Sequence, residues 1–523
     1  MLLLLRALAL LTSSNAPALL SRVYVEGVAG VPQEANPLLQ KPYGVGSEAD
    51  LSALLFEGLT RLGADGQPVP ALAEYWEIGS AGTVYTFTLR SGLRWHDGVE
   101  LTADDVAFSV QSVQSPDFAG DDRVAEPWRA VRAEALDDLR VRFELSAPFA
   151  PFLASTTLPI VPHHLLGDVA PADWASAPFS RRPIGAGPFR LHTLDAREAM
   201  LVPFEGSVRG RPKLDLLVLR FYPSVAIARA ALQRNEVQGV AWETGQHPGD
   251  ETSTDMFQRL RLPLAGYTML AMNLRVAPLD NQELRVALAQ ALDREELLRR
   301  AVGDGVQLLA SPILPQTPFH GAATLPIHAP IGAEQTLERL GWRPNAVGLR
   351  ERNGTTFSLR LMCADSVGQP ELAREIARQW RTVGIEVAID IVPREVLQTR
   401  LQGRDFVLAL QNWAVPTADP DIFALWHSSQ APAGANYAGL VDTRIDTLLA
   451  NGRSAVDQTR REELYQEFEE RWIALAPSVP LYQSSLTYEL APGVSPAGLD
   501  SSRLLPTASS RFDAISEWAV ESP

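Results

Sequence analysis

Histidines and carboxylates are the side chains of this sequence that could support catalysis, and their spacing assembles no catalytic group. His96 and Asp97 are neighbours in Trp95-His96-Asp97-Gly98. We interpret this segment as a turn, because glycine supplies turn conformations and aspartate can bond the nearby backbone. Glu243 and Asp419 could be imagined as paired carboxylates, but nothing in the sequence places them together.

Metal and cofactor chemistry are also not expected. His163 and His164 are adjacent, so they would point apart on a strand. Cys363 is the single cysteine, which excludes an intrachain disulfide and a thiolate zinc site. We interpret it as a small buried apolar side chain. The sequence has no Gly-x-Ser-x-Gly, His-Glu-x-x-His or phosphate-loop motif. We predict that the protein is not an enzyme and holds no metal or cofactor.

The elements around these residues alternate between strands and helices, which predicts an α/β fold. Val84–Arg90 alternates apolar and polar residues, as in a half-buried strand. Thr102 and Asp105 predict a capped helix start, followed by apolar residues at helical spacing. Further strands are predicted at 23–25, 141–145, 214–221, 237–242, 268–274, 357–362, 385–392 and 406–410, and helices at 49–59, 224–235, 281–302 (one bent helix or two), 370–383 and 464–475.

Length and charge narrow the function classes. The chain has 523 residues, enough for two or three lobes, and 46% of them are hydrophobic, so it can bury a large core. Its net charge is −16 at pH 7. This charge repels phosphate backbones and anionic membranes, so we expect no nucleic-acid partner.

The N-terminus has the features of an export signal. Met1–Thr12 is an apolar run, shorter than the ~20 residues that a membrane-spanning helix needs, and it suits the core of a signal peptide. Ala16-Pro17-Ala18 offers small residues for cleavage after Ala18, and Arg6 is the only early positive charge. No cysteine follows the run, so we expect no lipid anchor. We predict a periplasmic protein with residues 1–22 as signal peptide and leader.

A series of short motifs carries a family resemblance. These are Leu54-Leu55-Phe56-Glu57-Gly58-Leu59, the run from Pro68 to Trp76, Tyr85 to Arg90, Trp95 to Gly98 and Leu101 to Val106. In this order they resemble the dipeptide-, oligopeptide- and nickel-type extracytoplasmic solute-binding proteins of ABC importers, bacterial solute-binding protein family 5. Ile184–Phe189, Met272–Leu274, Asp419–Asp421, Asn436–Tyr437 and Val479–Tyr482 extend the resemblance over nearly the whole mature chain.

The resemblance implies a two-lobed periplasmic-binding-protein fold with hinge crossover strands and an extra N-terminal subdomain. Lobe I would take 23–45, 180–266 and 484–523, the subdomain 46–179, and lobe II 267–483. We expect the 54–113 block to be scaffold that does not contact the distinguishing groups of the ligand.

The implied function is capture of a peptide or peptide-like solute between the lobes and its delivery to ABC permease subunits, by a monomer. Alternatives within the family are a metallophore or nickel-type ligand, an opine or a sugar. His427 is the histidine nearest the late pocket segment, and a packing role is favoured for it. A periplasmic hydrolase or a chaperone is the alternative from another class.

Nine residues are implied to contact the ligand. Trp413 matches a tryptophan that the family places beside its ligand, and Asp419 could bind a cation or belong to a capped turn with Pro420 and Asp421. The full set is Glu34, Asn36, Thr244, Gln411, Asn412, Trp413, Asp419, Tyr437 and Tyr482.

One departure from the family pattern concerns the ligand's N-terminus. Free-peptide binders carry an aspartate three residues after the tryptophan, where it pairs with the peptide's α-ammonium, and this chain has Pro416. A buried, unpaired ammonium costs several kcal/mol. The hypothesis is that no free peptide N-terminus is held in the usual way. Either Asp419 substitutes, or the ligand is a blocked peptide, an opine, a sugar or a chelated metal.

We therefore expect unmodified di- to pentapeptides to bind weakly in isothermal titration calorimetry, because their ammonium lacks its usual partner. Submicromolar binding throughout that set would contradict the hypothesis.

Overall fold

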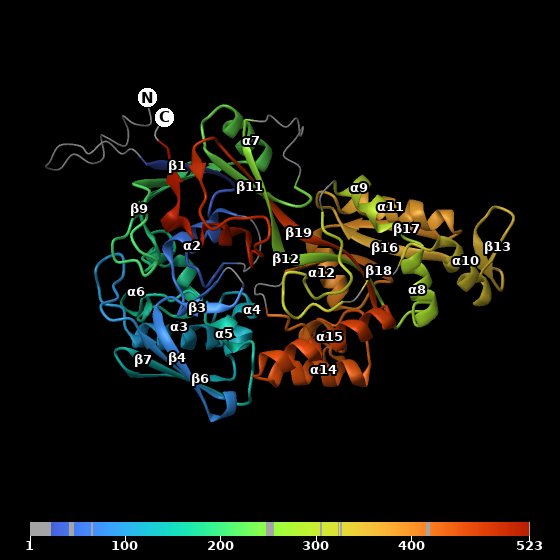
Figure 1. Cartoon of the computed structure of the whole chain (residues 1–523), viewed down its shortest axis with the longest axis horizontal. Coiled ribbons are helices and arrows are strands. Elements are labelled where there is room, and N and C mark those ends of the chain that lie inside the picture. Colours follow the sequence, from blue (N-terminus) through green and yellow to red (C-terminus); the bar gives the residue numbers. More distant parts are fainter. Residues whose placement is uncertain are drawn as a thin grey trace.

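The computed structural model describes residues 22–40, 46–63, 66–246, 256–303, 306–322, 324, 327–414 and 419–521. The predicted signal segment, apart from Arg22, and Pro416 lie outside these ranges. The chain forms two lobes, a larger one containing both ends of the described chain and a smaller one (Figure 1). Among the described residues, no helix has the length and apolar character that crossing a membrane requires.

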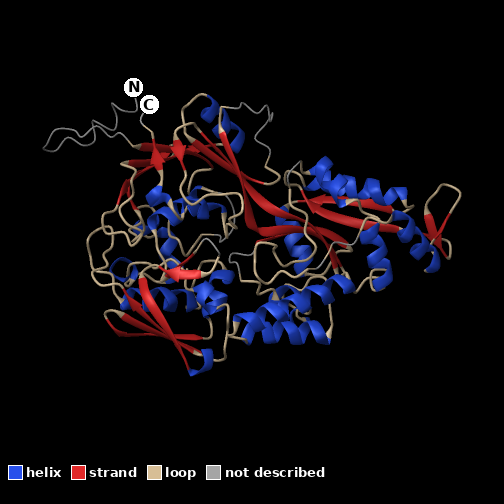
Figure 2. Cartoon of the chain, in the orientation of Figure 1, coloured by secondary structure: helices blue, strands red, loops and turns tan. Residues whose placement is uncertain are grey.

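One mixed ten-stranded sheet runs through both lobes (Figure 2). Its order is β17 (Glu386–Val392), β16 (Ser358–Ala364), β18 (Leu408–Ala414), β12 (Gln258–Met272), β19 (Ser478–Leu490), β11 (Gly239–Glu243), β1 (Val23–Ala29), β10 (Leu216–Tyr222), β9 (Glu198–Pro203) and β8 (Phe189–Leu194). The first three strands belong to the second lobe and the last five to the first lobe. The fold class is therefore the predicted two-lobed α/β type.

The central pair, β12 and β19, is antiparallel and joins the lobes. Gln258–Pro263 pairs with residues 485–490, and the ladder resumes at Tyr267. Between these segments Leu264 bridges Leu505 instead. The sequence predicted a strand only at 268–274, which is wrong at the N-terminal side. Pro263 and Gly266 are residues that usually disfavour a strand interior, and the strand is held there by partners distant in sequence.

The N-terminal subdomain is built on a four-stranded antiparallel sheet. Its order is β4 (Ala73–Gly79), β5 (Val84–Leu89), β7 (Arg140–Leu145) and β6 (Val131–Asp137). Helix α3 (Ala103–Gln114) packs on this sheet, and the predicted capping box of Thr102 and Asp105 is present. Trp95 and Phe143 of this region share one buried cluster with Tyr24 and Trp518 of the first lobe. The subdomain is therefore fused to the first lobe through a common core, and the predicted boundary at 46–179 stays a proposal.

The remaining elements have the following bounds. Helices are α2 (Ser47–Leu55), α4 (Asp122–Ala125), α5 (Phe152–Ser155), α6 (His163–Leu166), α7 (Val225–Gln233), α8 (Gln282–Gln290), α9 (Arg294–Ala301), α10 (Pro330–Arg339), α11 (Gln369–Thr382), α12 (Arg394–Gln402), α13 (Phe423–Trp426), α14 (Thr443–Ser454) and α15 (Gln458–Leu475). Short strand pairings are β2 (Thr60–Leu62) with β3 (Pro68–Pro70), β13 (Arg343–Pro344) with β14 (Arg350–Arg352) and β15 (Thr355–Thr356), and β20 (Val494–Ser495) with β21 (Ala519–Val520). Short 3₁₀ turns lie at Ser80–Gly82, Glu126–Trp128, Pro171–Ser176, Pro178–Ser180, Ser428–Gln430, Ala508–Phe512 and Ile515–Glu517.

The 281–302 segment is two helices, because Asp293 starts a new one by accepting a hydrogen bond from the backbone N–H of Glu296. Gly384 follows α11 with a φ of +83°, as expected for a glycine that ends a helix.

A buried ionic cluster fastens the C-terminal segment to the first lobe. The Arg511 guanidinium pairs with Glu26 on β1 at 2.9 Å and with Asp50 on α2 at 2.6 Å. All three side chains are 0–1% exposed. Burial raises the pKa of Glu26, although Arg511 and Tyr24 oppose the shift. The two carboxylates share one counter-ion, since the Arg511 guanidinium bonds both of them.

We predict that Arg511→Leu lowers the free energy of unfolding by about 3–5 kcal/mol, because two buried carboxylates would lose their counter-ion. Urea denaturation followed by tryptophan fluorescence measures the change. The exposed Arg182 provides the control, and Arg182→Gln should change stability by less than about 0.5 kcal/mol. Equal stability of the two variants would show that the cluster contributes little.

Candidate ligand-binding site

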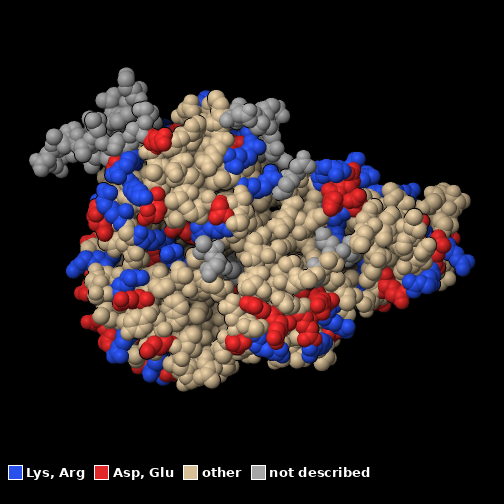
Figure 3. Space-filling view, in the orientation of Figure 1, with Lys and Arg blue, Asp and Glu red and all other residues tan. Residues whose placement is uncertain are grey.

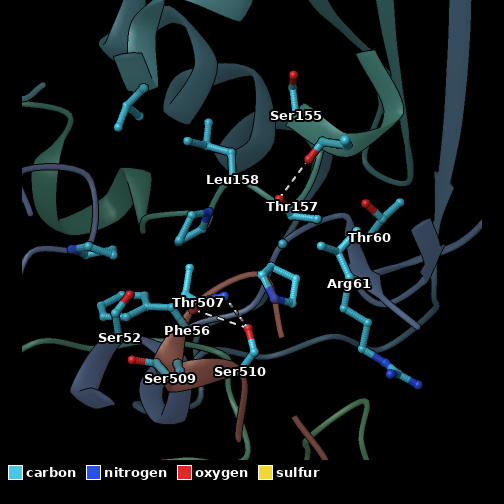
Figure 4. A pocket seen from close by; sticks show the side chains of 18 of the residues that line it. Ser52, Phe56, Thr60, Arg61, Ser155, Thr157, Leu158, Thr507, Ser509 and Ser510 are labelled. Atoms are coloured by element: carbon cyan, nitrogen blue, oxygen red, sulfur yellow. Dashed lines mark hydrogen bonds between the residues drawn. The ribbon is translucent and has the colours of Figure 1, made fainter. Parts of the chain in front are cut away.

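A cavity of about 500 Å³ lies where the first lobe, its subdomain and the second lobe meet. Figure 4 shows part of its wall. The second lobe contributes Asp419 and Asp421 to the wall. The first lobe and subdomain contribute Arg209 and some residues from each of the segments 37–40, 49–62, 123–128, 149–159 and 506–513. Its volume is in the range of sites for small organic ligands.

The wall after α2 is positioned by a close backbone contact. Gly187 donates its N–H to the carbonyl oxygen of Leu55 at 2.9 Å. A Cβ on Gly185 would lie 1.8 Å from that same oxygen, so only glycine fits. The Gly185-Ala186-Gly187 turn thus holds the end of α2, from which Phe56 to Leu62 enter the cavity wall.

His96 locks the same turn from the other side. The backbone N–H of Gly185 donates to Nδ1 of His96 at 3.2 Å, so Nε2 carries the proton and donates to the carbonyl oxygen of Gly187 at 3.1 Å. Burial lowers the pKa of His96 to about 4. Asp97 accepts the Val99 N–H at 3.1 Å within the predicted turn. His96 and Asp97 are therefore structural, as expected.

The cavity wall combines apolar surface with hydroxyl groups (Figure 4). Phe56, Trp128, Phe149 and Leu158 are among the apolar residues that line it. The hydroxyl of Thr157 donates to the carbonyl of Ala154 at 2.8 Å. Those of Thr507 and Ser510 bond each other at 3.2 Å. The hydroxyls of Ser52 and Ser155 have no hydrogen-bond partner within the described chain, so they are available to a ligand.

Each carboxylate among the described residues that line the cavity is held by an arginine. Three pairs are Glu57 with Arg209 at 2.6 Å, Asp421 with Arg453 at 2.7 Å and Asp513 with Arg503 at 2.9 Å. Burial raises the pKa of Asp513 to about 6, although Arg209 and Arg503 oppose the shift.

The fourth carboxylate, Asp419, is held by Arg461 through both oxygens at 2.9 Å. Burial is the main influence that raises the pKa of Asp419, and Arg461 opposes it. The Asp421 N–H also donates to Asp419 at 3.1 Å. The structure therefore contains the capped turn, and the cation beside Asp419 is Arg461.

The lobes contact each other on two sides of the molecule. The Ala150 N–H in the subdomain donates to the Arg453 carbonyl in the second lobe at 2.8 Å, and the Arg453 guanidinium lies 5.2 Å from the Phe149 ring centre. On the other side, Gly245 of the first lobe lies close to Val367 of the second lobe. A Cβ added to Gly245 would be 3.3 Å from the Val367 carbonyl oxygen. The lobes are therefore closed on each other.

The structure gathers some of the other predicted residues near the end of β18. Trp413 stacks on Tyr437 with ring centres 5.9 Å apart. The Tyr437 hydroxyl accepts a hydrogen bond from Gln398 at 3.0 Å. Asn412 accepts from Thr268 at 3.0 Å and from Gln369 at 2.9 Å, and Gln411 is buried.

The remaining predicted residues lie at the crossover and in the first-lobe loop. Thr244 and Ser485 exchange hydrogen bonds through side chain and backbone. Tyr482 is 8% exposed on β19, and burial raises its pKa. Glu34 accepts the Asn36 N–H at 2.7 Å.

Asn36 is fully buried, and its Nδ2 has no hydrogen-bond partner in the described part of the chain. Of the nine predicted residues, Asp419 alone is among the described residues that line the cavity. Ligand contact by all nine stays a prediction.

His427 has the packing role that the sequence analysis favoured. Its ring stacks on Phe423 with centres 4.0 Å apart, and Nδ1 lies 2.8 Å from the Ser429 hydroxyl. No group of three or more histidine, cysteine, aspartate or glutamate side chains suited to a metal occurs among the described residues.

The prediction that the 54–113 block does not contact the distinguishing groups of the ligand stays a prediction, although residues between Phe56 and Leu62 line the cavity. Arg61 also lines the cavity and was not among the predicted site residues, since it lies between the family motifs at 54–59 and 68–76. The signal available in the sequence was an arginine in an otherwise uncharged stretch, Gly58 to Gly63.

The comparisons with known proteins agree with this fold. Residues 67–435 match the family described as bacterial extracellular solute-binding proteins, family 5 middle region. The match covers more than half of the chain, so the protein belongs to this family.

Curated relatives include the oligopeptide-binding protein AppA of Bacillus subtilis, 27% identical over 83% of this chain and 81% of that protein. The dipeptide-binding protein of Escherichia coli is 25% identical over 92% of both chains. Among solved structures, AppA of Bacillus subtilis with a nonapeptide has a TM-score of 0.74, 23% identity and coverage of 95% and 98%. NikZ of Campylobacter jejuni with Ni(L-His) has a TM-score of 0.76, 21% identity and coverage of 95% and 99%.

The His96 geometry predicts a loss of stability in acid. The unfolded chain takes up a proton near pH 6.5, whereas folded His96 remains neutral until about pH 4. The unfolded state therefore binds more protons between these values, and the free energy of unfolding falls as the pH drops from 6.5 to 4, by up to about 3 kcal/mol. Urea denaturation at each pH measures this slope. His96→Gln should flatten it, and an unchanged slope in that variant would contradict the assignment.

Proposed function

We propose that this protein is the solute-binding component of an ABC importer, which captures a peptide or peptide-like solute between its lobes and presents it to membrane permease subunits. The observation that carries the proposal is the cavity of about 500 Å³ whose wall comes from both lobes. A solute in that cavity contacts both lobes only when they are closed, so its binding favours closure.

The energetic requirement is modest. Moving a protein from mostly open to mostly closed takes about 5.5 kcal/mol of differential binding. Burial of apolar groups against Phe56 and Trp128 and a few polar contacts can supply that difference. The Ala150–Arg453 contact adds an interaction between lobes that does not depend on the ligand.

The other parts of the proposal rest on general properties. Membership of an extracellular family and the apolar N-terminal run support export to the periplasm. The net charge of −16 and the acidic side chains gathered over α14 and α15 (Figure 3) support the absence of a nucleic-acid partner. Pairing of every described cavity carboxylate with arginine supports binding rather than catalysis. We propose a monomer, since one chain supplies both walls of the cavity.

The test combines ligand identification with a blocked cavity. Native mass spectrometry of protein purified without denaturation should reveal a bound solute, and calorimetry with peptides and N-acetylated peptides should give saturable binding. Ser155→Trp, which fills the cavity, should weaken binding at least tenfold. Ser91→Trp on the exposed turn is the matched control and should bind as the unaltered protein does.

Three results would contradict the proposal. Full affinity in Ser155→Trp would place the ligand elsewhere. Turnover of a peptide or ester library would indicate a hydrolase, and binding without saturation or lobe closure in small-angle scattering would indicate a chaperone.

A further inference from the structure

Among the described residues that line the cavity, one cation has no charged partner. The four lining carboxylates, Glu57, Asp419, Asp421 and Asp513, each have an arginine partner within 2.6–2.9 Å. The cavity-lining Arg123 pairs with Asp121 at 2.6 Å. The two charges within each pair cancel, so the pairs attract neither an anionic nor a cationic group of a ligand.

Arg61 is different. It lies on β2, lines the cavity and is partly buried. Within the described chain its side chain makes no ion pair and no hydrogen bond, and the acid it influences, Asp513, is already paired with Arg503. In Figure 4 the Arg61 side chain extends along one edge of the cavity, across the view from Ser52.

A partly buried, unpaired guanidinium favours an anionic partner. Guanidinium groups bind carboxylates through two parallel hydrogen bonds, and partial exclusion of water strengthens the attraction. An ammonium group meets the opposite situation, because each described carboxylate of the wall is already neutralised. The apolar side chains between these poles suit an uncharged body.

We propose that Arg61 is a specificity-determining residue that binds the carboxylate of the solute, and that the solute is a peptide-like acid without a free ammonium group. This inference rests on the proposed function and names the ligand class of the same cavity.

Three probes with one common body test the proposal by calorimetry at constant ionic strength: N-acetyl-dialanine, its uncharged C-terminal amide, and dialanine amide, which carries an ammonium. We expect the acid to bind at least tenfold more tightly than the uncharged amide and the ammonium probe to bind most weakly. Arg61→Gln should bring the acid within threefold of the amide and leave the affinity for the amide unchanged. Arg61→Lys should keep part of the preference, since the charge remains but the two-pronged geometry is lost.

The matched control is Arg182→Gln, which removes one exposed arginine outside the cavity and should keep the full preference. An unchanged acid-to-amide ratio in Arg61→Gln would overturn the role of Arg61. Absence of that preference in the unaltered protein would overturn it too, while leaving the proposed function intact if the probes still bind.

If none of the three probes binds, the solute that co-purifies with the protein tests the inference. If native mass spectrometry then identifies an acid that is lost in Arg61→Gln, the inference is supported. A neutral or cationic solute overturns the inference alone, and the absence of any solute overturns both the inference and the proposed function.

Discussion

The antiparallel pairing of β12 with β19 is the constraint on which the rest of the structure depends. Each strand runs through both lobes, so neither lobe can leave the other without breaking the central sheet. The ladder has its longest interruption between Pro263 and Tyr267, where the Gln483 side chain donates to the carbonyl of Leu264 at 3.0 Å, and its register shifts again between Thr268 and Met269. Rotation of the lobes therefore concentrates at this interruption, because the paired segments on either side are held by regular backbone hydrogen bonds.

The cavity inherits its shape from contacts made well away from it. Helix α2 is held at one end by Arg511, through Asp50, and at the other by the glycine turn that His96 locks. Since Phe56 to Leu62 follow directly, the wall is as rigid as these two attachments. A preformed wall on the larger lobe lowers the cost of ordering the site on binding. The second wall comes into contact with the ligand when the smaller lobe rotates.

Paired charges explain how an acidic protein can offer a site to an anion. The net charge of −16 acts over the whole surface and is screened by salt within about 10 Å. In the cavity, arginines neutralise the lining carboxylates, and Arg61 sets the sign of what remains. Local pairing therefore outweighs the average charge of the chain.

The sequence by itself determined the family, the two-lobed α/β class and most local elements. These depend on periodicity, capping and turn residues, as at Val84–Arg90, Thr102 and Gly384, which act over a few neighbours. It also indicated Asp419, which lines the cavity, although not its Arg461 partner, which is 42 residues away. Only the tertiary structure decided the N-terminal half of β12, the lock of His96 on Gly185 and Gly187, and the cavity where Arg61 has no partner among the described residues. Each of these depends on which distant segments are brought together and which charges find a partner, and no local pattern records that.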